Sequence, residues 1–253
     1  FNAHFKGAVT SPNASVLAQV PSLNRLFQIC PTGCSAAQIA NTLAPYPTLN
    51  SAIPANVYVL HDASQNNIMN LYAEGLDIAI TYDFDTSWGH WALGTGITEF
   101  LQYDISFGSP VEGPRYSLLN TDGQTSQFPQ IQHQSRTTIG WSMDNVSLDL
   151  AMNFTGGYRN WATPANPLTR DANGNPSGGG DAVKANMTFD LHGAYDFDDG
   201  ILEGSQVYFT ITNLTDKHPP FYNSQGQAAI TGTDDMVTSL IGRLTVVGVR
   251  TKF

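Results

Sequence analysis

The sequence is poor in charge, and poorer still in basic residues. Only 13% of its 253 residues are charged, and 21 acidic side chains against 11 Lys and Arg give a net charge of −10. Because binding to a nucleic-acid backbone depends on cationic side chains, this balance excludes that class of partner. We expect no nucleic acid to bind the chain.

Long apolar runs are absent as well. No uninterrupted apolar stretch approaches the roughly 18 residues that mark a membrane-spanning helix. This excludes a helical membrane protein. It leaves a transmembrane β-barrel open, because the strands of a barrel alternate in polarity and barely raise the mean hydropathy.

The chain also has no initiator Met and no signal-peptide pattern at its start. It begins at Phe1 with residues that already alternate like a strand, and neither a basic nor an apolar leader segment precedes them. We therefore expect a processed or truncated product.

Cysteine is nearly absent. The two cysteines, Cys30 and Cys34, flank a Pro-Thr-Gly sequence that suits a tight turn. We predict a local disulfide made in an oxidising compartment. A metal site is disfavoured because there is no second cysteine pair and the nearest histidines, His4 and His61, are distant in the sequence. We expect no metal and no other cofactor.

What the chain does contain is glycine, proline and alternating apolar residues. Its 23 Gly and 14 Pro suit many strands joined by turns and loops. Period-two alternation predicts eight strands, at residues 1–9, 76–84, 88–103, 136–143, 146–154, 187–197, 207–212 and 241–253. One helix is expected over residues 35–44, with Ser35 as its cap and Pro45 near its end.

The last strand has two different faces. Phe253, Val249 and Val247 share one face with threonines, whereas Lys252 and Arg250 lie on the other. A strand with one apolar face, one charged face and a terminal aromatic suits the end of a transmembrane barrel, with Phe253 at the membrane interface. An amphipathic strand of a soluble sandwich is the alternative.

The lengths of the connections favour the barrel. Short connections near Asp85, Asp144 and Asp199 alternate with long ones after Val9, Tyr103, Phe154 and Asn213. In an up-and-down sheet, all long loops then project from one rim and all short turns from the other, as in outer-membrane barrels. Aromatic residues gather near the short turns, at Tyr82, Phe84, Trp88, Trp91, Trp141, Tyr195 and Phe197. We predict an all-β, antiparallel transmembrane β-barrel portion with long extracellular loops and short periplasmic turns.

Several segments resemble a known family. The stretch N-L-T-D-K-H-P-P-F-Y-N-S at 213–224, followed by I-G-R-L-T-V-V-G-V-R-T-K-F at 241–253, resembles the C-terminal end of a TonB-dependent outer-membrane receptor. Thr215 stands where the family usually has an aromatic residue. E-G-L-D-I-A-I-T-Y-D-F at 74–84, I-G-W-S at 139–142 and N-F-T-G-G-Y at 153–158 are similar to other parts of its pattern.

The resemblance implies a part of a larger protein. Barrels of this family have about 22 strands and an N-terminal plug. At about 10 residues per strand, those strands alone would use about 220 residues. Residues 1–253 are therefore expected to be the C-terminal part of the barrel domain, with the plug and the early strands missing.

The same resemblance implies a function and a location. The family takes up a scarce ligand, such as an iron–siderophore, cobalamin or a glycan, across the cell outer membrane of a Gram-negative bacterium. We expect no enzymatic activity of the chain. Expected partners are outer-membrane lipid, the barrel-assembly machinery that reads Phe253, and the TonB system through the missing plug.

Ligand contacts in this chain are expected in the long loops. Tyr158, Arg159, Trp161 and Arg170 form an aromatic and basic group in the third loop, which suits an anionic or catecholate ligand. The competing interpretation is that they pack within the loops and the interfacial belt. On the strands, polar residues such as Asp77, Asp149, Asp190 and His192 are expected to form a hydrated inner wall.

Two other functions remain in view. The first is a complete eight-stranded barrel acting as an adhesin or structural protein, in which the first and last strands pair with each other. The second is an outer-membrane hydrolase, for which Asp234, Asp235 and His218 share a loop. No nucleophile accompanies them and no catalytic motif is present, so no catalytic residue is predicted.

Overall fold

The computed structural model describes residues 1–10, 26–45, 52–62, 64–108, 112–113, 115–122, 130–160, 169–170, 176–223 and 232–251. The chain divides into two compact units. Unit 1 comprises Phe1–Asn2, Ala73–Tyr103 and Ser117–Phe253. Unit 2 comprises Ala3–Tyr72 and Asp104–Tyr116.

One large antiparallel sheet dominates the described chain. Its eight principal strands follow the order β1 (Asn2–Thr10), β4 (Asn66–Thr86), β5 (Gly89–Phe107), β8 (His133–Met143), β9 (Val146–Thr155), β14 (Asn186–Asp196), β15 (Ser205–Thr212) and β16 (Leu244–Thr251). A short strand, β6 (Arg115–Ser117), pairs with β5. The predicted all-β class and the count of eight strands are confirmed. Among the described residues no pairing joins β1 to β16, so the sheet is open.

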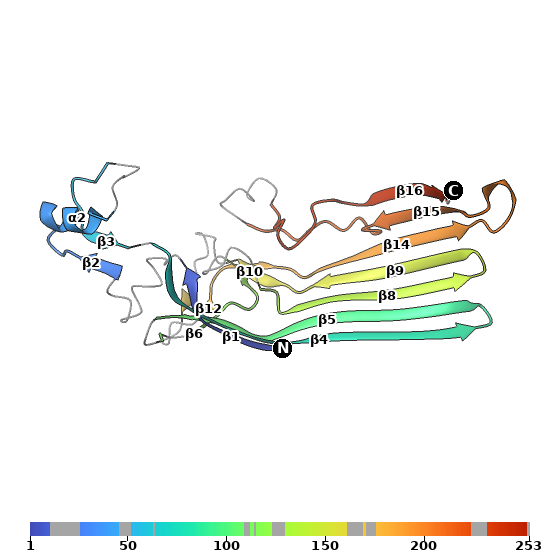
Figure 1. Ribbon diagram of the computed structural model, residues 1–253, viewed down its shortest axis with the longest axis horizontal. Coiled ribbons are helices and arrows are strands. Elements are labelled where there is room, and N and C mark those ends of the chain that lie inside the picture. Colours follow the sequence, from blue (N-terminus) through green and yellow to red (C-terminus); the bar gives the residue numbers. More distant parts are fainter. Residues whose placement is uncertain are drawn as a thin grey trace. The chain divides into compact units, whose positions relative to one another are not determined.

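The short connections lie at one end of the sheet. Ser87 and Trp88 join β4 to β5, Asp144 and Asn145 join β8 to β9, and the 3-10 helix η2 (Gly200–Leu202) lies between β14 and β15. Figure 1 shows these three turns together on its right-hand side. Asp144 has a positive φ of 49°, which a two-residue hairpin turn requires.

The register sorts side chains onto two faces. Leu150 of β9 lies opposite Ile139 of β8 and Leu191 of β14, and Leu191 lies in turn opposite Ile211 of β15. The next residue on β9 belongs to the other face, where Ala151 lies opposite Thr138 and Asp190. Because side chains alternate along a strand, this register keeps one apolar face and one polar face across the strands.

Unit 2 contains a small disulfide-bridged substructure. Cys30 and Cys34 are joined by a disulfide with their Cα atoms 5.0 Å apart. β2 (Phe27–Ile29) pairs with β3 (Val59–His61), and the amide of Cys34 donates to the carbonyl of Val57 at 2.6 Å. The disulfide therefore holds the turn beside the segment that leads into β3.

The only helix longer than one turn in the described residues is α2 (Ala36–Leu43). Ser35 caps it through a capping box: Ser35 Oγ accepts from the amide of Gln38 at 3.3 Å, and Gln38 Oε1 accepts from the amide of Ser35 at 2.8 Å. The predicted helix and its cap are thus present. No described helix is long and apolar enough to cross a membrane.

Short strands organise parts of the long connections. β10 (Tyr158–Asn160) pairs antiparallel with β13 (Asp181–Val183) and parallel with β7 (Thr121–Asp122). β11 (Thr169–Arg170) pairs with β12 (Pro176–Gly178). Strands of two or three residues carry no detectable periodicity, which is why the sequence did not predict them.

The N-L-T-D-K segment is tied to the start of the last strand. Asn213 Oδ1 accepts from the amide of Lys217 at 2.8 Å, and Asp216 Oδ1 accepts from the amide of Arg243 at 2.9 Å. A Cβ on Gly242 would lie only 3.0 Å from the Asp216 carboxylate. The hydrogen bond between Asp216 and Arg243 therefore joins the N-L-T-D-K segment to the I-G-R segment, although a long connection separates the two in the sequence.

Candidate functional site

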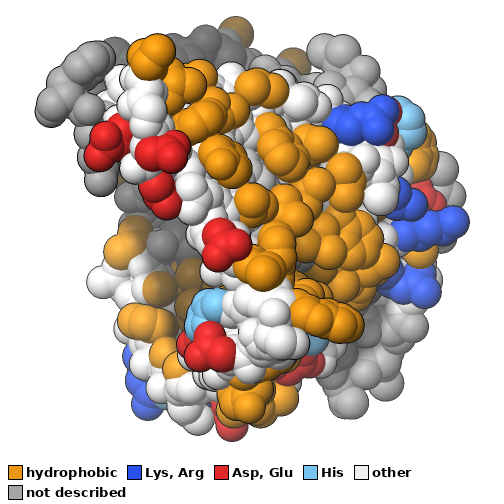
Figure 2. All heavy atoms as spheres, turned by 90° about the vertical axis from the view of Figure 1, so that its right-hand side faces the viewer, with side chains coloured by type: hydrophobic (Ala, Val, Ile, Leu, Met, Phe, Trp, Pro, Cys, Tyr) orange, Lys and Arg blue, Asp and Glu red, His pale blue; other side chains and the backbone are white. Residues whose placement is uncertain are grey.

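The apolar face of the sheet in unit 1 is uncovered. Ile80 is 57% exposed, Tyr82 62% and Val247 71%. Other large apolar side chains exposed on this face are Leu76, Ile78, Leu93, Ile139, Leu148, Val207 and Val249. Figure 2 shows apolar side chains gathered in a broad patch when the molecule is viewed from its short-turn end. Soluble monomers rarely expose so large a contiguous apolar surface, which marks a face that meets an apolar partner.

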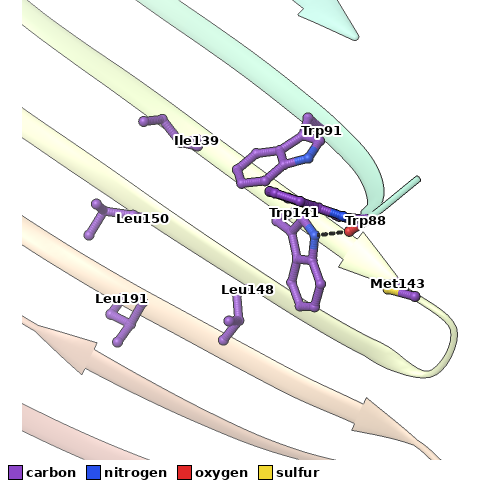
Figure 3. Close-up of a pocket in the computed structure, with 8 residues that line it drawn as sticks. All are labelled: Trp88, Trp91, Ile139, Trp141, Met143, Leu148, Leu150 and Leu191. Atoms are coloured by element: carbon purple, nitrogen blue, oxygen red, sulfur yellow. Dashed lines mark hydrogen bonds between the residues drawn. The ribbon is translucent and has the colours of Figure 1, made fainter. Parts of the chain in front are cut away.

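Aromatic side chains cluster where this face reaches the short turns. The rings of Tyr82 and Phe84 lie 5.6 Å apart, and those of Tyr195 and Phe197 lie 4.9 Å apart. Trp141 Nε1 donates a hydrogen bond of 2.7 Å to the carbonyl of Trp88, drawn in Figure 3. An apolar body with a satisfied polar group is the chemistry of aromatics at a membrane interface.

A shallow hollow lies among these aromatics. Its volume is about 590 Å³. It is lined by Trp88, Trp91, Ile139, Trp141, Met143, Leu148, Leu150 and Leu191. Figure 3 shows these side chains projecting from neighbouring strands of the sheet. The hollow offers hydrocarbon and ring surfaces to an occupant.

The opposite face is a hydrogen-bonded polar wall. Asn153 Nδ2 donates to Asp190 Oδ2 at 2.8 Å, and Arg136 Nη1 lies 3.5 Å from the same oxygen and also donates to Asn153. Asp190 Oδ1 accepts from the backbone amide of Asn213 at 2.9 Å. The row therefore crosses β8, β9 and β14 and reaches the N-L-T-D-K segment.

The predicted inner-wall residues lie on this polar face. Thr98 Oγ1 donates to Asp77 Oδ1 at 2.8 Å, and His192 Nδ1 lies 2.9 Å from Thr210 Oγ1. Both are local cross-strand contacts between polar side chains. Among the described residues no group of three or more His, Cys, Asp and Glu is placed to hold a metal ion.

Glu99, which the alternation places on the apolar face, has a cross-strand partner. It lies directly opposite His133, whose Nδ1 is 2.7 Å from Glu99 Oε2. Trp91, which comes eight residues before Glu99 on β5, lies opposite Trp141 in the aromatic cluster. The polar pair therefore lies on the apolar face, away from the short turns, and Leu101, two residues further along β5, is again an exposed apolar side chain.

Two of the four predicted ligand residues lie in β10 and differ in environment. Tyr158 is 5% exposed, packs in a cluster with Ile131, Val183 and Tyr222, and donates through its hydroxyl to Asp234. Arg159 is exposed, and its guanidinium donates to the carbonyl of Gly179 at 3.2 Å.

The remaining predicted site residues lie at the limits of the described structure. Trp161 and Phe253 lie outside the described residues, and Arg170 is described only by its place in β11. All four ligand contacts, and the role of Phe253 as assembly signal, stay predictions.

The structure adds polar residues that the sequence did not single out. Asn160 is fully buried and donates through its amide to the carbonyl of Asn223. Asn223 Nδ2 in turn donates to Asp181 Oδ2 at 3.0 Å. These bonds join segments separated by 42 and 63 positions in the chain. No local sequence signal could have found them.

Unit 2 contains its own polar cluster around Tyr72. The Tyr72 hydroxyl lies 2.7 and 2.8 Å from the two carboxylate oxygens of Glu112. The Arg115 guanidinium lies 3.6 Å from the ring centroid, and the His4 ring stacks at 4.0 Å. Burial, followed by the hydrogen bond and charge of Glu112, raises the pKa of the Tyr72 hydroxyl above its usual 10.0.

Glu112 is held in its ionised form. Burial by itself would raise the pKa of its carboxyl. Hydrogen bonds from Ser106, Tyr72 and Arg115, together with the guanidinium charge, outweigh burial and hold that pKa below its usual 4.5. Because the pKa of this carboxyl is lower in the folded chain than in the unfolded chain, its ionised form stabilises the folded segment. The stabilisation is complete above the pKa of the unfolded chain and is lost as the pH falls through the pKa of the folded chain.

We therefore expect acid to loosen the segment around Glu112. The amide of Gly113, which donates to the Phe107 carbonyl at 2.7 Å, should lose protection from hydrogen exchange below the usual carboxyl pKa, after correction for intrinsic exchange chemistry. Glu112→Ala should raise the hydrogen-exchange rate of this amide at neutral pH by about 10-fold or more, because hydrogen bonds to a charged group are lost. Glu203→Gln, at an exposed turn residue, is the control and should change nothing. Equal protection in Glu112→Ala and wild type would contradict the assignment.

No family model matches the chain, and no curated protein matches it. Two solved structures resemble part of the chain: crystal structures of two mutants of the ferric enterobactin receptor PfeA from Pseudomonas aeruginosa, one of them in complex with enterobactin. Both are 18% identical over 73% of this chain, with TM-scores of 0.42 and 0.41.

The chain covers 23% and 22% of those two receptor chains, less than a quarter of their length. Similarity at this level does not establish that the chain belongs to their family.

Proposed function

We propose that the chain forms part of the wall of an outer-membrane β-barrel receptor of the TonB-dependent kind, in a Gram-negative bacterium. The observation that carries this proposal is the two-faced sheet. Its uncovered apolar face suits contact with lipid, and its hydrogen-bonded polar face suits a water-filled or plugged lumen. The short turns then face the periplasm and the long connections face the exterior.

The dimensions of the apolar band support a membrane crossing. Residues 91–99 of β5 run from the aromatic cluster to the Glu99–His133 pair, a stretch of nine residues. A transmembrane strand, tilted by about 45°, needs about 9–11 residues. β8 and β9 contain 11 and 10 residues, which suits the same crossing. Tyr72 and Glu112 belong to unit 2 and not to this stretch of β5.

The open sheet supports a part of a larger barrel over a closed eight-stranded one. The order of the described strands begins with β1 and ends with β16, and these two pair with β4 and β15 respectively. In the proposal, strands that belong to the rest of the protein complete the barrel. We propose no catalytic role for the chain.

The complete protein would import a scarce ligand, with energy supplied through TonB and a plug domain. Among iron–siderophore, cobalamin and glycan ligands, we place the iron–siderophore class first. Arg159 is an exposed cation next to a buried aromatic, in a connection that would face the exterior. A guanidinium suits anionic and catecholate groups.

Replacement of Arg159 tests the ligand assignment. Arg159→Ala is expected to weaken binding of a ferric catecholate siderophore to intact cells by about 10-fold, the value of a lost charge-assisted contact. Lys184→Ala removes an exposed cation from the segment after β13 and is the matched control, with a change of less than about twofold. Radiolabelled iron on the siderophore reports the binding. Equal effects of the two variants would exclude a specific contact of Arg159 with this ligand.

A further inference from the structure

We propose that Tyr158 and Asp234 are positioning residues for the ligand contact of Arg159. Through this pair the connection between β15 and β16 holds β10 in place, so that the Arg159 side chain is presented at one fixed position. This inference rests on the proposed function, because it takes Arg159 as a contact for an anionic or catecholate ligand. It goes further by assigning the fixing of that contact to a residue 76 positions from Tyr158 in the sequence.

β10 presents its three residues in two directions. Tyr158 and Asn160 are buried, whereas Arg159 between them is exposed. Because successive side chains of a strand point to opposite sides, one side of β10 faces the interior of the folded connections and the other presents the guanidinium. The Arg159 amide donates to the Asn120 carbonyl at 2.8 Å. The position of the guanidinium therefore depends on the position of the strand.

Both buried residues of β10 are bonded to the connection between β15 and β16. The Tyr158 hydroxyl donates to Asp234 Oδ2, and the side-chain amide of Asn160 donates to the carbonyl of Asn223. Tyr222 packs in the same apolar cluster as Tyr158, with the two ring centroids 6.3 Å apart. A segment that is distant in sequence therefore holds the buried side of the strand.

Asp234 is itself fixed within its segment. It is buried, and its Oδ1 accepts from the amide of Met236 at 3.1 Å. Its carbonyl accepts from the amide of Thr238 at 3.0 Å and from the Thr238 hydroxyl at 2.9 Å. The carboxylate thus holds the tyrosine hydroxyl in one direction, because a hydrogen bond to an ionised acceptor is stronger than one between neutral groups.

A guanidinium that is held in place before the ligand arrives binds it more tightly. One N–H of Arg159 donates to the Gly179 carbonyl at 3.2 Å, and the planar fork of the guanidinium has further donors for a ligand. If β10 became ordered only on binding, the ordering would cost affinity, and a strand fixed in advance avoids this cost. Loss of the Asp234 bond should therefore weaken ligand binding, although the buried carboxylate does not touch the ligand.

A double-mutant cycle in the complete protein on intact cells tests the inference. The probe is a radiolabelled ferric catecholate siderophore. Asp234→Ala should raise its dissociation constant by about fivefold, the size of coupling through a shared backbone shift, with an unchanged number of binding sites per receptor. In the Arg159→Ala background, Asp234→Ala should change the dissociation constant by less than about twofold. Asp234→Asn keeps an oxygen acceptor for the Tyr158 hydroxyl and should restore most of the affinity.

Asp235→Ala is the matched control. Asp235 is the exposed neighbour of Asp234 with the same charge, and its loss should leave the dissociation constant unchanged in both backgrounds. Equal weakening by Asp234→Ala with and without Arg159, or fewer binding sites at unchanged affinity, would indicate a structural role only and overturn the inference. An unchanged dissociation constant in Asp234→Ala would overturn it while the Arg159 contact stands. If Arg159→Ala itself leaves the affinity unchanged, the proposed ligand contact fails, and the positioning role fails with it.

Discussion

Leu150→Arg is expected to be among the most damaging single substitutions in the chain. Leu150 lies within the apolar band, opposite Ile139 on one neighbouring strand and Leu191 on the other. An arginine at the lipid-facing midplane of a barrel costs about 2–4 kcal/mol. A cost of this size lowers the equilibrium ratio of inserted to uninserted protein by about 30- to 1,000-fold.

Asp149→Arg is the matched control, one residue earlier on the same strand. Asp149 belongs to the polar face, where it lies opposite Gly140 and His192. There an arginine can remain hydrated, and we expect a change of less than about 1 kcal/mol. Urea titration of folding into lipid vesicles, followed by the electrophoretic shift of the folded barrel, measures both variants. Equal tolerance of the two arginines would contradict the assignment of the faces.

Gly89→Ala is expected to have the second-largest effect. Gly89 begins β5 with a φ of 111°, a conformation that residues with a side chain rarely adopt. A Cβ at this position would also clash with the backbone carbonyl of Ser142 in the neighbouring hairpin. Neither the backbone of β8 nor that of the turn can move without breaking ladder bonds, so we expect destabilisation of about 2–4 kcal/mol.

Gly96→Ala is the control for this substitution. Gly96 lies on the same strand, and a Cβ there would meet no atom within 4 Å. Because an alanine fits a strand better than a glycine, we expect Gly96→Ala to be neutral or stabilising by up to about 1 kcal/mol. The same urea titration compares the pair. A neutral Gly89→Ala would show that the hairpin ends are not packed against each other in this way.

The sequence predicted the regular part of the sheet because period-two alternation is a local signal. β9, expected at 146–154, is Val146–Thr155, and β8, expected at 136–143, is His133–Met143. The helix could be predicted equally well, because its capping residue and the residue that completes the capping box are only three positions apart in the sequence. Each of these features depends on side chains within one element.

The start of β4 was missed because a polar residue occupies a buried position. β4 begins at Asn66, whereas the alternation predicted residues 76–84. Ile68 and Tyr72 are buried on alternating positions, and the intervening Asn70 is 8% exposed, bonded to Ser106. A buried asparagine with a distant partner breaks the apolar pattern while preserving the strand.

The sequence also could not predict which of the site residues are buried and which are exposed. Tyr158 and Arg159 are neighbours in one aromatic and basic segment, yet the first is in a core and the second is exposed. Burial of Tyr158 depends on Val183 from the far end of the same connection, and on Ile131 and Tyr222 from two other connections. Long-range packing of this kind leaves no trace in local composition.

The central claim is that one face of the sheet contacts lipid and the other contacts water. Single cysteines placed in turn at residues 147–153 of β9 and spin-labelled in the intact protein in bilayers measure this directly, because Cys30 and Cys34 are bonded to each other. The account predicts that collisions with oxygen are high at 148, 150 and 152, whereas collisions with a water-soluble nickel complex are high at 147, 149 and 153. Low oxygen accessibility at 148, 150 and 152, as in the interior of a two-sheet sandwich, would contradict it.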